Sequence, residues 1–216
     1  PHDWVVDLGY AADASHSHGY KTVGWKYPEY SVGWYRREIY FDESARGRHV
    51  ELRFDGIFRD ADVWFNGFWM GNEPSGYATQ TYDISDYIRY GEKNVIAVRV
   101  DASLEEGWFY EGAGIYRNVW LVESSPLHFV SDGVAVASDI CGDRASLDIS
   151  VEVVNGGRQS NDYTITHRIL DSQGLEVART RPQKGGLLQP REVAVSSAEV
   201  KVRNIELWSP EAPHLY

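Results

Sequence analysis

Cysteine, basic residues and long apolar runs are all scarce in this chain. The only cysteine, Cys141, has no partner for an internal bridge, so a small domain stapled by disulfides is excluded. Lys and Arg total 21 against 32 Asp and Glu, a formal net charge of −11. An acidic protein repels phosphate backbones and anionic lipids, so we expect neither nucleic acid nor a membrane as a partner. No apolar run approaches the roughly 20 residues of a membrane-spanning helix.

The two ends of the sequence carry expectations of their own. No secretory signal peptide is present, but the chain opens at Pro1 without a Met, so we expect an upstream segment to have been removed. The sequence is compatible with a parent protein in the cytoplasm and with one that is periplasmic or secreted. The last residues, His214-Leu215-Tyr216, begin an apolar alternation that stops, so we expect the chain to be truncated.

His16 and His18 lack a third ligand nearby, and we expect no metal and no cofactor.

The aromatic residues are unevenly distributed along the chain. Residues 1–125 hold 7 of the 8 Trp, 12 of the 14 Tyr and 6 of the 7 Phe. The acidic excess is also larger there, with 12 basic against 20 acidic residues, compared with 9 against 12 in residues 126–216. A chain of 216 residues is long enough for two modest domains. We therefore expect one domain in 1–125 and another in 126–216.

Alternation of apolar and polar residues predicts strands in both parts. Residues 49–54 place apolar side chains on one face and charged ones on the other, as in a half-buried strand. Asn66-Gly67 predicts a hairpin turn between strands at 60–65 and 68–70, because both turn positions need a positive φ. Further strands are predicted at 94–100, 118–122, 147–153 and 163–169, and a short helical turn at 84–90 capped by Ser85. This pattern predicts an all-β fold, with a second sandwich of immunoglobulin-like size.

The stretch Glu106–Arg117 combines aromatic residues, two acids, three glycines and an arginine. Aromatic faces stack on the apolar faces of sugar rings, and a neighbouring acid can orient hydroxyl groups. Glycine lets a backbone turn sharply or approach a ligand closely. Packing of an aromatic loop against another domain is the alternative interpretation.

Five motifs follow one another in the first part of the chain. They are Gly33-Trp34-Tyr35-Arg36-Arg37, Phe54-Asp55-Gly56-Ile57 with Ala61-Asp62-Val63-Trp64-Phe65-Asn66-Gly67, Ser75-Gly76-Tyr77, 94–101 and 112–121. Together these motifs resemble the N-terminal sugar-binding domain of family 2 glycoside hydrolases. The motif at the end of the chain, 208–216, resembles the end of the immunoglobulin-like domain that follows in that family, so the resemblance covers essentially the whole chain.

This resemblance implies a jelly-roll β-sandwich, then an immunoglobulin-like β-sandwich, and in the full-length enzyme a (β/α)8 barrel. Hydrolysis in the family is retaining and uses two glutamates about 5 to 5.5 Å apart. Both lie on the barrel in this family, so we assign no catalytic residue to this chain. Glu73 follows Asn72 as the acid/base glutamate of such barrels follows an asparagine, but it lies in the loop of the sugar-binding domain.

The same resemblance suggests which residues contact substrate. Loops of this domain reach the barrel mouth in the family's β-galactosidases, and we predict substrate binding by Asn72, Glu73, Trp108 and Glu111. Solvation of an exposed turn and packing against the barrel are the alternatives for these positions. Arg117 is instead expected to be buried and paired with Asp55, Asp60 or Asp62.

The functional hypothesis is a non-catalytic N-terminal region of a retaining exo-glycosidase, most like β-galactosidases. Its partners would be a β-galactoside and the missing barrel, and a homo-oligomer is left open. The alternatives are a freestanding carbohydrate-binding module, or a parent enzyme that is a β-mannosidase or a β-glucuronidase. A purely structural pair of sandwiches would leave the acidic loops and dense aromatics of residues 1–125 without a use.

Overall fold

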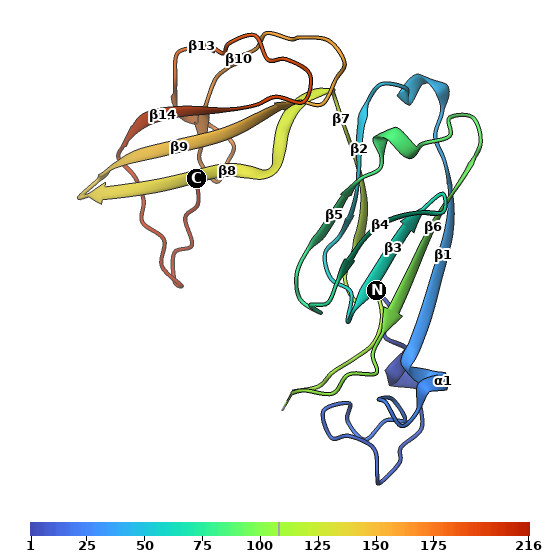
Figure 1. Ribbon diagram of the computed structural model, residues 1–216. Helices are drawn as coiled ribbons and strands as arrows, with labels where there is room; N and C mark the ends of the chain where they lie inside the picture. Colours follow the sequence, from blue (N-terminus) through green and yellow to red (C-terminus); the bar gives the residue numbers. More distant parts are fainter. Residues whose placement is uncertain (108) are drawn as a thin grey trace. The chain divides into compact units, whose positions relative to one another are not determined.

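The computed structural model describes residues 1–107 and 109–216 (Figure 1). The chain divides into two compact units, Pro1–Glu123 and Ser124–Tyr216. Trp108, one of the predicted substrate-binding residues, lies outside the described residues. Both units are built almost entirely of strands arranged as sandwiches, which confirms the all-β prediction of a jelly-roll sandwich followed by an immunoglobulin-like one.

The first unit contains a four-stranded and a three-stranded sheet. The four-stranded sheet has the order β1-β6-β3-β4, and the three-stranded sheet has the order β5-β2-β7. Short helices lie between some strands. The strands are β1 (Val32–Tyr40), β2 (His49–Phe54), β3 (Ala61–Phe65), β4 (Phe68–Glu73), β5 (Gln80–Asp83), β6 (Lys93–Asp101) and β7 (Val119–Ser124); the helices are η1 (Trp4–Asp7), α1 (Pro28–Ser31), η2 (Glu43–Ala45) and η3 (Ser85–Tyr87).

Alternation along the strands builds the core of the first unit. Strands β2, β3 and β6 each bury every second side chain, which confirms the half-buried strand predicted at 49–54. Because successive side chains of a strand point to opposite faces, the intervening residues stay on the outer face of each sheet. The buried set is Phe41, Val50, Leu52, Phe54, Ile57, Ala61, Val63, Phe65, Ile84, Ile96, Val98 and Val100.

The hairpin predicted at Asn66-Gly67 joins β3 and β4. Asn66 has φ 52° and Gly67 has φ 87°, the positive values that this turn requires. The Asn66 side chain adds a second function, because its Oδ1 accepts a hydrogen bond from the Val95 N–H at 2.9 Å. The turn is therefore also bonded to the neighbouring strand β6.

The helical turn predicted at 84–90 is shorter, and no side-chain hydrogen bond caps it. Only Ser85–Tyr87 form a 3-10 helix. Ser85 does not cap it, because Ser85 is the first residue of the helix and Ile84 stands at the N-cap position. Ile84 is fully buried in the core, and this anchor fixes where the turn can begin.

The second unit is built on one long three-stranded sheet, β14-β9-β8. Shorter strands form two separate antiparallel pairs, β10 with β13 and β11 with β12. The buried residues of β9 and β14 pack with Ile165 and Leu188. The strands are β8 (Leu127–Cys141), β9 (Arg144–Asn155), β10 (Thr164–Ile165), β11 (Arg168–Leu170), β12 (Glu176–Arg179), β13 (Gln183–Lys184) and β14 (Val193–Arg203).

The single strand predicted at 163–169 is wrong, because the structure divides it into β10 and β11. At the break, the His167 N–H donates to Thr180 Oγ1 at 3.0 Å and its carbonyl accepts from the Thr180 N–H at 2.9 Å. His167 is buried at this point. The chain thus changes its pairing partner within two residues, which a period-2 pattern does not reveal.

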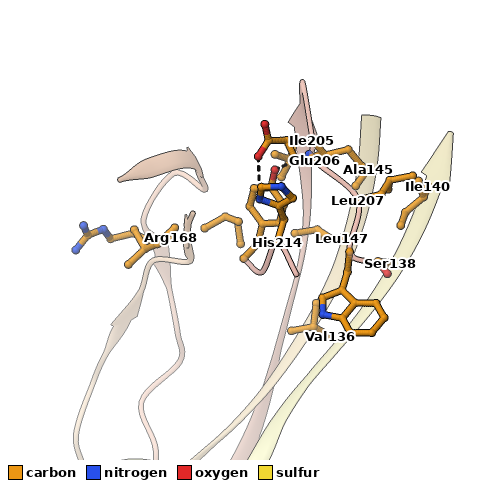
Figure 2. Close-up of a pocket in the computed structure, with 15 residues that line it drawn as sticks. Val136, Ser138, Ile140, Ala145, Leu147, Arg168, Ile205, Glu206, Leu207 and His214 are labelled. Atoms are coloured by element: carbon orange, nitrogen blue, oxygen red, sulfur yellow. Dashed lines mark hydrogen bonds and ion pairs between the residues drawn. The ribbon is translucent and has the colours of Figure 1, made fainter. Parts of the chain in front are cut away.

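A mostly apolar groove of about 600 Å³ lies within the second unit (Figure 2). Val136, Ile140 and Leu147 line it from the sheet, and Leu207 lines it from the C-terminal segment. His214 Nδ1 lies 2.9 Å from Glu206 Oε2 at the same groove.

Among the helices of the described residues, none has the length and apolar character needed to cross a membrane.

Candidate functional site

Residues 1–27, here called the N-terminal segment, are hydrogen-bonded to the loop that follows β6. This loop, residues 102–118, is here called the aromatic loop. The His2 N–H donates to the Ile115 carbonyl at 2.8 Å, and the Trp4 N–H donates to the Ala113 carbonyl at 3.1 Å. Asp3 Oδ1 accepts from the Ala113 N–H at 3.0 Å. Residues far apart in the sequence therefore form one end of the first sandwich.

Glu111 is the organising side chain of the aromatic loop. Its side chain has no exposed surface. Its Oε1 accepts hydrogen bonds from the N–H groups of Glu106 at 3.1 Å and Gly107 at 2.8 Å. A buried carboxylate needs such donors, because burial without partners is costly. Glu111 thereby ties its own position in the chain to the backbone of Glu106 and Gly107.

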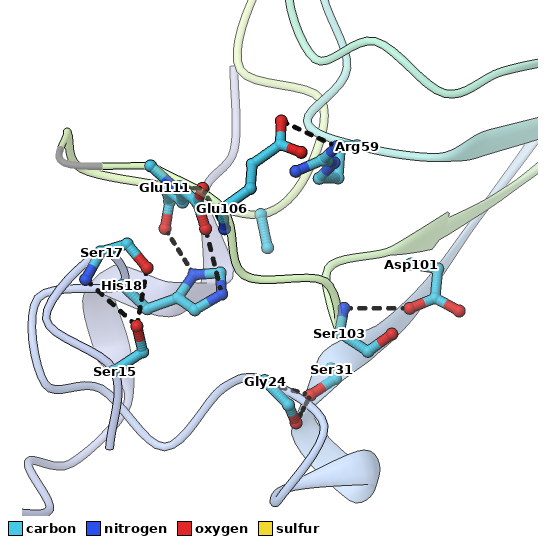
Figure 3. A network of polar contacts seen from close by, with 12 residues as sticks. Ser15, Ser17, His18, Gly24, Ser31, Arg59, Asp101, Ser103, Glu106 and Glu111 are labelled. Carbon is cyan, nitrogen blue, oxygen red and sulfur yellow. Dashed lines mark hydrogen bonds and ion pairs between the residues drawn. The ribbon is translucent and has the colours of Figure 1, made fainter. Parts of the chain in front are cut away.

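His18 faces Glu111 from the N-terminal segment (Figure 3). Its Nδ1 lies 2.9 Å from the Glu111 carbonyl oxygen, which can only accept, so Nδ1 carries the hydrogen. Its Nε2 then lies 3.5 Å from Glu111 Oε2, and neither side chain is exposed. The Glu111 N–H completes the contact by donating to the Ser17 carbonyl at 2.6 Å. With its ring held inside the domain, His18 does not present a metal ligand beside His16.

Arg59 approaches the aromatic loop from the segment after β2. It is only 8% exposed, and its Nη2 lies 3.1 Å from Glu106 Oε1. The backbone next to it is fixed by mutual hydrogen bonds between Phe58 and Gly114, at 2.9 and 2.6 Å. Sequence analysis did not single out Arg59, because no local pattern marks one arginine between Phe58 and Asp60 as half of a long-range ion pair.

Asn72 and Glu73 lie at the end of β4, close in sequence to the loop at 75–77. Asn72 is exposed, and its Nδ2 donates to Asp60 Oδ1 at 3.0 Å. Glu73 is half-buried, and its Oε1 accepts from the Ser75 N–H at 2.9 Å. The first contact ties β4 to the residue after Arg59, and the second shapes the turn that leads to Tyr77.

Three aromatic rings connect these segments. Phe58 and Tyr77 meet edge to face with ring centroids 5.7 Å apart, and Tyr77 and Phe109 meet in the same way at 6.2 Å. Tyr77 is 56% exposed and Phe109 is 50% exposed, so both offer ring surface to a ligand. Partial burial raises the pKa of Tyr77, and its hydroxyl can donate or accept a hydrogen bond.

The predicted substrate-binding residues that the structure describes, Asn72, Glu73 and Glu111, differ in how accessible they are to a ligand. Asn72 is open to a ligand, and Glu73 is partly open. Glu111 has no exposed surface, so a sugar could touch its carboxylate only after the aromatic loop moved. Whether any of these residues binds substrate stays a prediction.

The expectation from the sequence that Arg117 is buried and paired with an aspartate is wrong. Arg117 is exposed, and its guanidinium carbon lies 5.4 Å from the ring centroid of Tyr116. The three aspartates proposed as partners already have other donors. Asp55 accepts from Trp120, Asp60 accepts from Asn72, and Asp62 accepts from Trp69.

Tyr110 gives a testable property of this end of the domain. Partial burial, followed by the charge of Asp3 and a hydrogen bond to Asp3 Oδ2 at 3.2 Å, raises the pKa of Tyr110 to about 12. We expect Asp3→Asn to lower that pKa toward the ordinary value of about 10, because a neutral amide no longer repels the tyrosinate. Ring-carbon NMR shifts of Tyr110, followed through an alkaline titration, measure this change.

Asp7→Asn is the matched control for Asp3→Asn. It removes the same charge from an exposed residue of the N-terminal segment without touching the Tyr110 hydroxyl. An equal shift in both variants would contradict a specific role for Asp3. Since the pKa is raised in the folded state, the stability contribution of Tyr110 is complete below about pH 10 and is lost as the pH rises through about 12.

Known proteins are similar to this chain in both sequence and fold. A family model described as glycosyl hydrolases family 2, sugar binding domain, matches residues 26–125. A second model, glycosyl hydrolases family 2, matches residues 128–216. A β-galactosidase of Bacteroides ovatus is 34% identical over 100% of this chain and 25% of its own length. A putative β-glucuronidase of Formosa agariphila is also 34% identical, over 100% of this chain and 20% of its own length.

Solved structures agree with these sequence matches. A glycosyl hydrolase family 2 member from Bacteroides cellulosilyticus superposes with a TM-score of 0.88 at 30% identity, over 99% of this chain and 28% of its own. The β-glucuronidase of Bacteroides uniformis gives a TM-score of 0.83 at 27% identity, over 99% of this chain and 25% of its own. The chain thus spans about a quarter of the length of these relatives. The two family models follow one another over residues 26–125 and 128–216, which is most of the sequence, so the chain belongs to glycosyl hydrolase family 2.

Proposed function

We propose that this chain is the N-terminal, non-catalytic region of a retaining exo-glycosidase that hydrolyses terminal β-D-galactosides. The observation that carries the proposal is the order of the two family matches, within a chain that spans only 25% of a β-galactosidase relative. In family 2 the two catalytic glutamates belong to the barrel, which would lie outside these residues. The role of this chain would be to shape the sugar subsite and to pack on that barrel.

The end of the first sandwich supports a contribution to substrate binding. The exposed rings of Tyr77 and Phe109 can stack on a sugar, and Asn72 can exchange hydrogen bonds with hydroxyl groups. The buried contacts of Glu111 hold the aromatic loop in place for this purpose. Preorganised loops lower the entropy cost of binding.

A β-glucuronide is the second candidate substrate. The putative β-glucuronidase relative has the same 34% identity as the β-galactosidase. The Arg59 guanidinium favours it as well, since arginine binds carboxylates strongly and with defined geometry. Its Nη2 is already paired with the Glu106 carboxylate, so a uronate would compete with that contact.

Hydrolysis assays test the proposal. We expect purified residues 1–216 to show no turnover of aryl β-D-galactoside, β-D-glucuronide or β-D-mannoside. The longer natural polypeptide should hydrolyse the galactoside fastest. Turnover by residues 1–216 alone would contradict the non-catalytic role, and a faster glucuronide reaction in the longer polypeptide would assign the second candidate. Calorimetry with galactose tests the freestanding module, which requires binding by the isolated chain.

A further inference from the structure

Three tryptophans lie in a row on the outer face of the four-stranded sheet; Trp34, Trp64 and Trp69 are here called the tryptophan row. Trp64 on β3 is directly opposite Trp69 on β4 and Ala97 on β6. Directly paired residues share a face of the sheet, and the opposite face is the one that carries the buried valines Val63 and Val98. The row therefore runs across strands β1, β3 and β4, which Figure 1 shows in one sheet.

The two outer rings of the row, Trp34 and Trp69, are exposed, and Trp64 between them is partly buried. Trp34 and Trp64 stack with centroids 5.5 Å apart and planes inclined by 26°. The small side chain of Ala97 on the strand between them leaves room for this stack. Trp34 is 63% exposed and Trp69 is 60% exposed. Exposed aromatic rings that gather on one face of a sheet are the kind of surface that binds a partner or ligand.

Polar contacts hold the row in place and leave its surroundings nearly neutral. The Trp69 Nε1–H donates to Asp62 Oδ1 at 3.0 Å, which fixes the orientation of that indole. Arg99 forms ion pairs on the same face. Its Nη1 lies 3.7 Å from Asp62 Oδ2, and its Nη2 lies 2.7 Å from Asp101 Oδ2. In a chain with a net charge of −11, this locally paired surface suits an uncharged ligand.

A pocket of about 260 Å³ adjoins the row at Trp34. Its walls include Trp4 and Tyr30, and its polar groups include His2 and Glu29. A carboxylate and an imidazole can bind the hydroxyl groups of a ligand whose apolar face rests on an indole. The pocket and the row together offer stacking surface and hydroxyl-binding groups side by side.

We propose that the tryptophan row and this pocket form a binding site for a neutral oligosaccharide. Sugar rings would stack on the exposed Trp69 and Trp34, with the partly buried Trp64 supporting Trp34 from the side, and the sugar beyond Trp34 would place its hydroxyls in the pocket. A pyranose is flat, uncharged and apolar on its ring faces, which matches ordered indoles in a neutral surround. The inference rests on these residues and not on the proposed hydrolase function.

Titration of residues 1–216 with cello-, xylo- and β-1,4-galacto-oligosaccharides of increasing length tests this site. We expect binding by at least one series, followed by calorimetry and by tryptophan fluorescence. Affinity should rise with length until the row is covered. Trp34→Ala and Trp69→Ala should each weaken binding by about tenfold, as expected for the loss of one stacked ring.

Trp25→Ala is the matched control, because Trp25 is 69% exposed in the same unit but lies outside the row. It should leave the affinity unchanged. Circular dichroism and the denaturant midpoint should be the same in all three variants, since the replaced rings are mostly in solvent. The hydrolysis assays with aryl glycosides described above do not depend on this result, because they measure turnover and not binding.

Three outcomes would overturn the proposal. The first is the absence of binding in every series, and the second is binding that survives the Trp34→Ala and Trp69→Ala changes together. The third is a dimer in light scattering that these two changes dissolve, which would make the row an interface between copies of the chain. Protection of Trp34 and Trp69 from oxidation only in a longer polypeptide, with no saccharide binding by the chain, would assign the row to a protein contact and equally overturn the saccharide site.

Discussion

Replacing Glu111 by alanine is expected to destabilise the first unit by about 3 kcal/mol, because it leaves two partly buried N–H groups without their acceptor and empties a fully buried site. These are the N–H groups of Glu106 and Gly107, which both donate to Glu111 Oε1. The change also removes the carboxylate that faces His18 Nε2 at 3.5 Å. Urea unfolding followed by tryptophan fluorescence measures the effect, since 7 of the 8 tryptophans lie in residues 1–125.

Two further variants make the Glu111 experiment specific. Glu105→Ala removes the same charge from the same loop without removing the acceptor of the two N–H groups, and it should cost under about 1 kcal/mol. Glu111→Gln keeps an oxygen at the Oε1 position, so it should lie between the two alanine variants. The role assigned to Glu111 would be wrong if Glu111→Ala and Glu105→Ala reduced the free energy of unfolding equally.

The strands of the first unit could be predicted from the sequence because their information is local. The alternation at 49–54 and the Asn66-Gly67 pair each specify a structure within a few residues. The second layer of the second unit was not predictable in the same way. Strands of two to four residues, such as β10 and β12, carry too little alternation to fix a partner, and their pairing depends on tertiary contacts.

The candidate site shows the same division between local and long-range information. Composition directed attention to Glu106–Arg117, but it could not show that Glu111 turns inward. That orientation depends on His18, which is 93 residues away in the sequence. The Arg59 and Glu106 contact is equally non-local. The direction in which such a loop side chain points therefore depends on residues that are distant in the sequence, which a local pattern does not contain.

Gly114→Ala is expected to be the most damaging single change at this end of the domain, with a loss of about 3 kcal/mol or more. Gly114 has φ +126°, which side chains rarely adopt. A Cβ there would also overlap the His2 carbonyl oxygen and the Tyr35 hydroxyl. Relief of the overlap would push the N-terminal segment away and break the His2–Ile115 and Trp4–Ala113 hydrogen bonds.

Gly67→Ala separates the steric part of this effect from the conformational part. Gly67 also has a positive φ, of +87°, but a Cβ there would meet nothing within 4 Å. Its replacement should cost only about 1 kcal/mol, the ordinary penalty for alanine in this backbone region. Hydrogen exchange adds a local readout, since the Trp4 amide should lose protection in Gly114→Ala and keep it in Gly67→Ala. Equal losses of stability in the two variants, with the Trp4 amide protected in both, would mean that close packing of the N-terminal segment is not the reason for glycine at position 114.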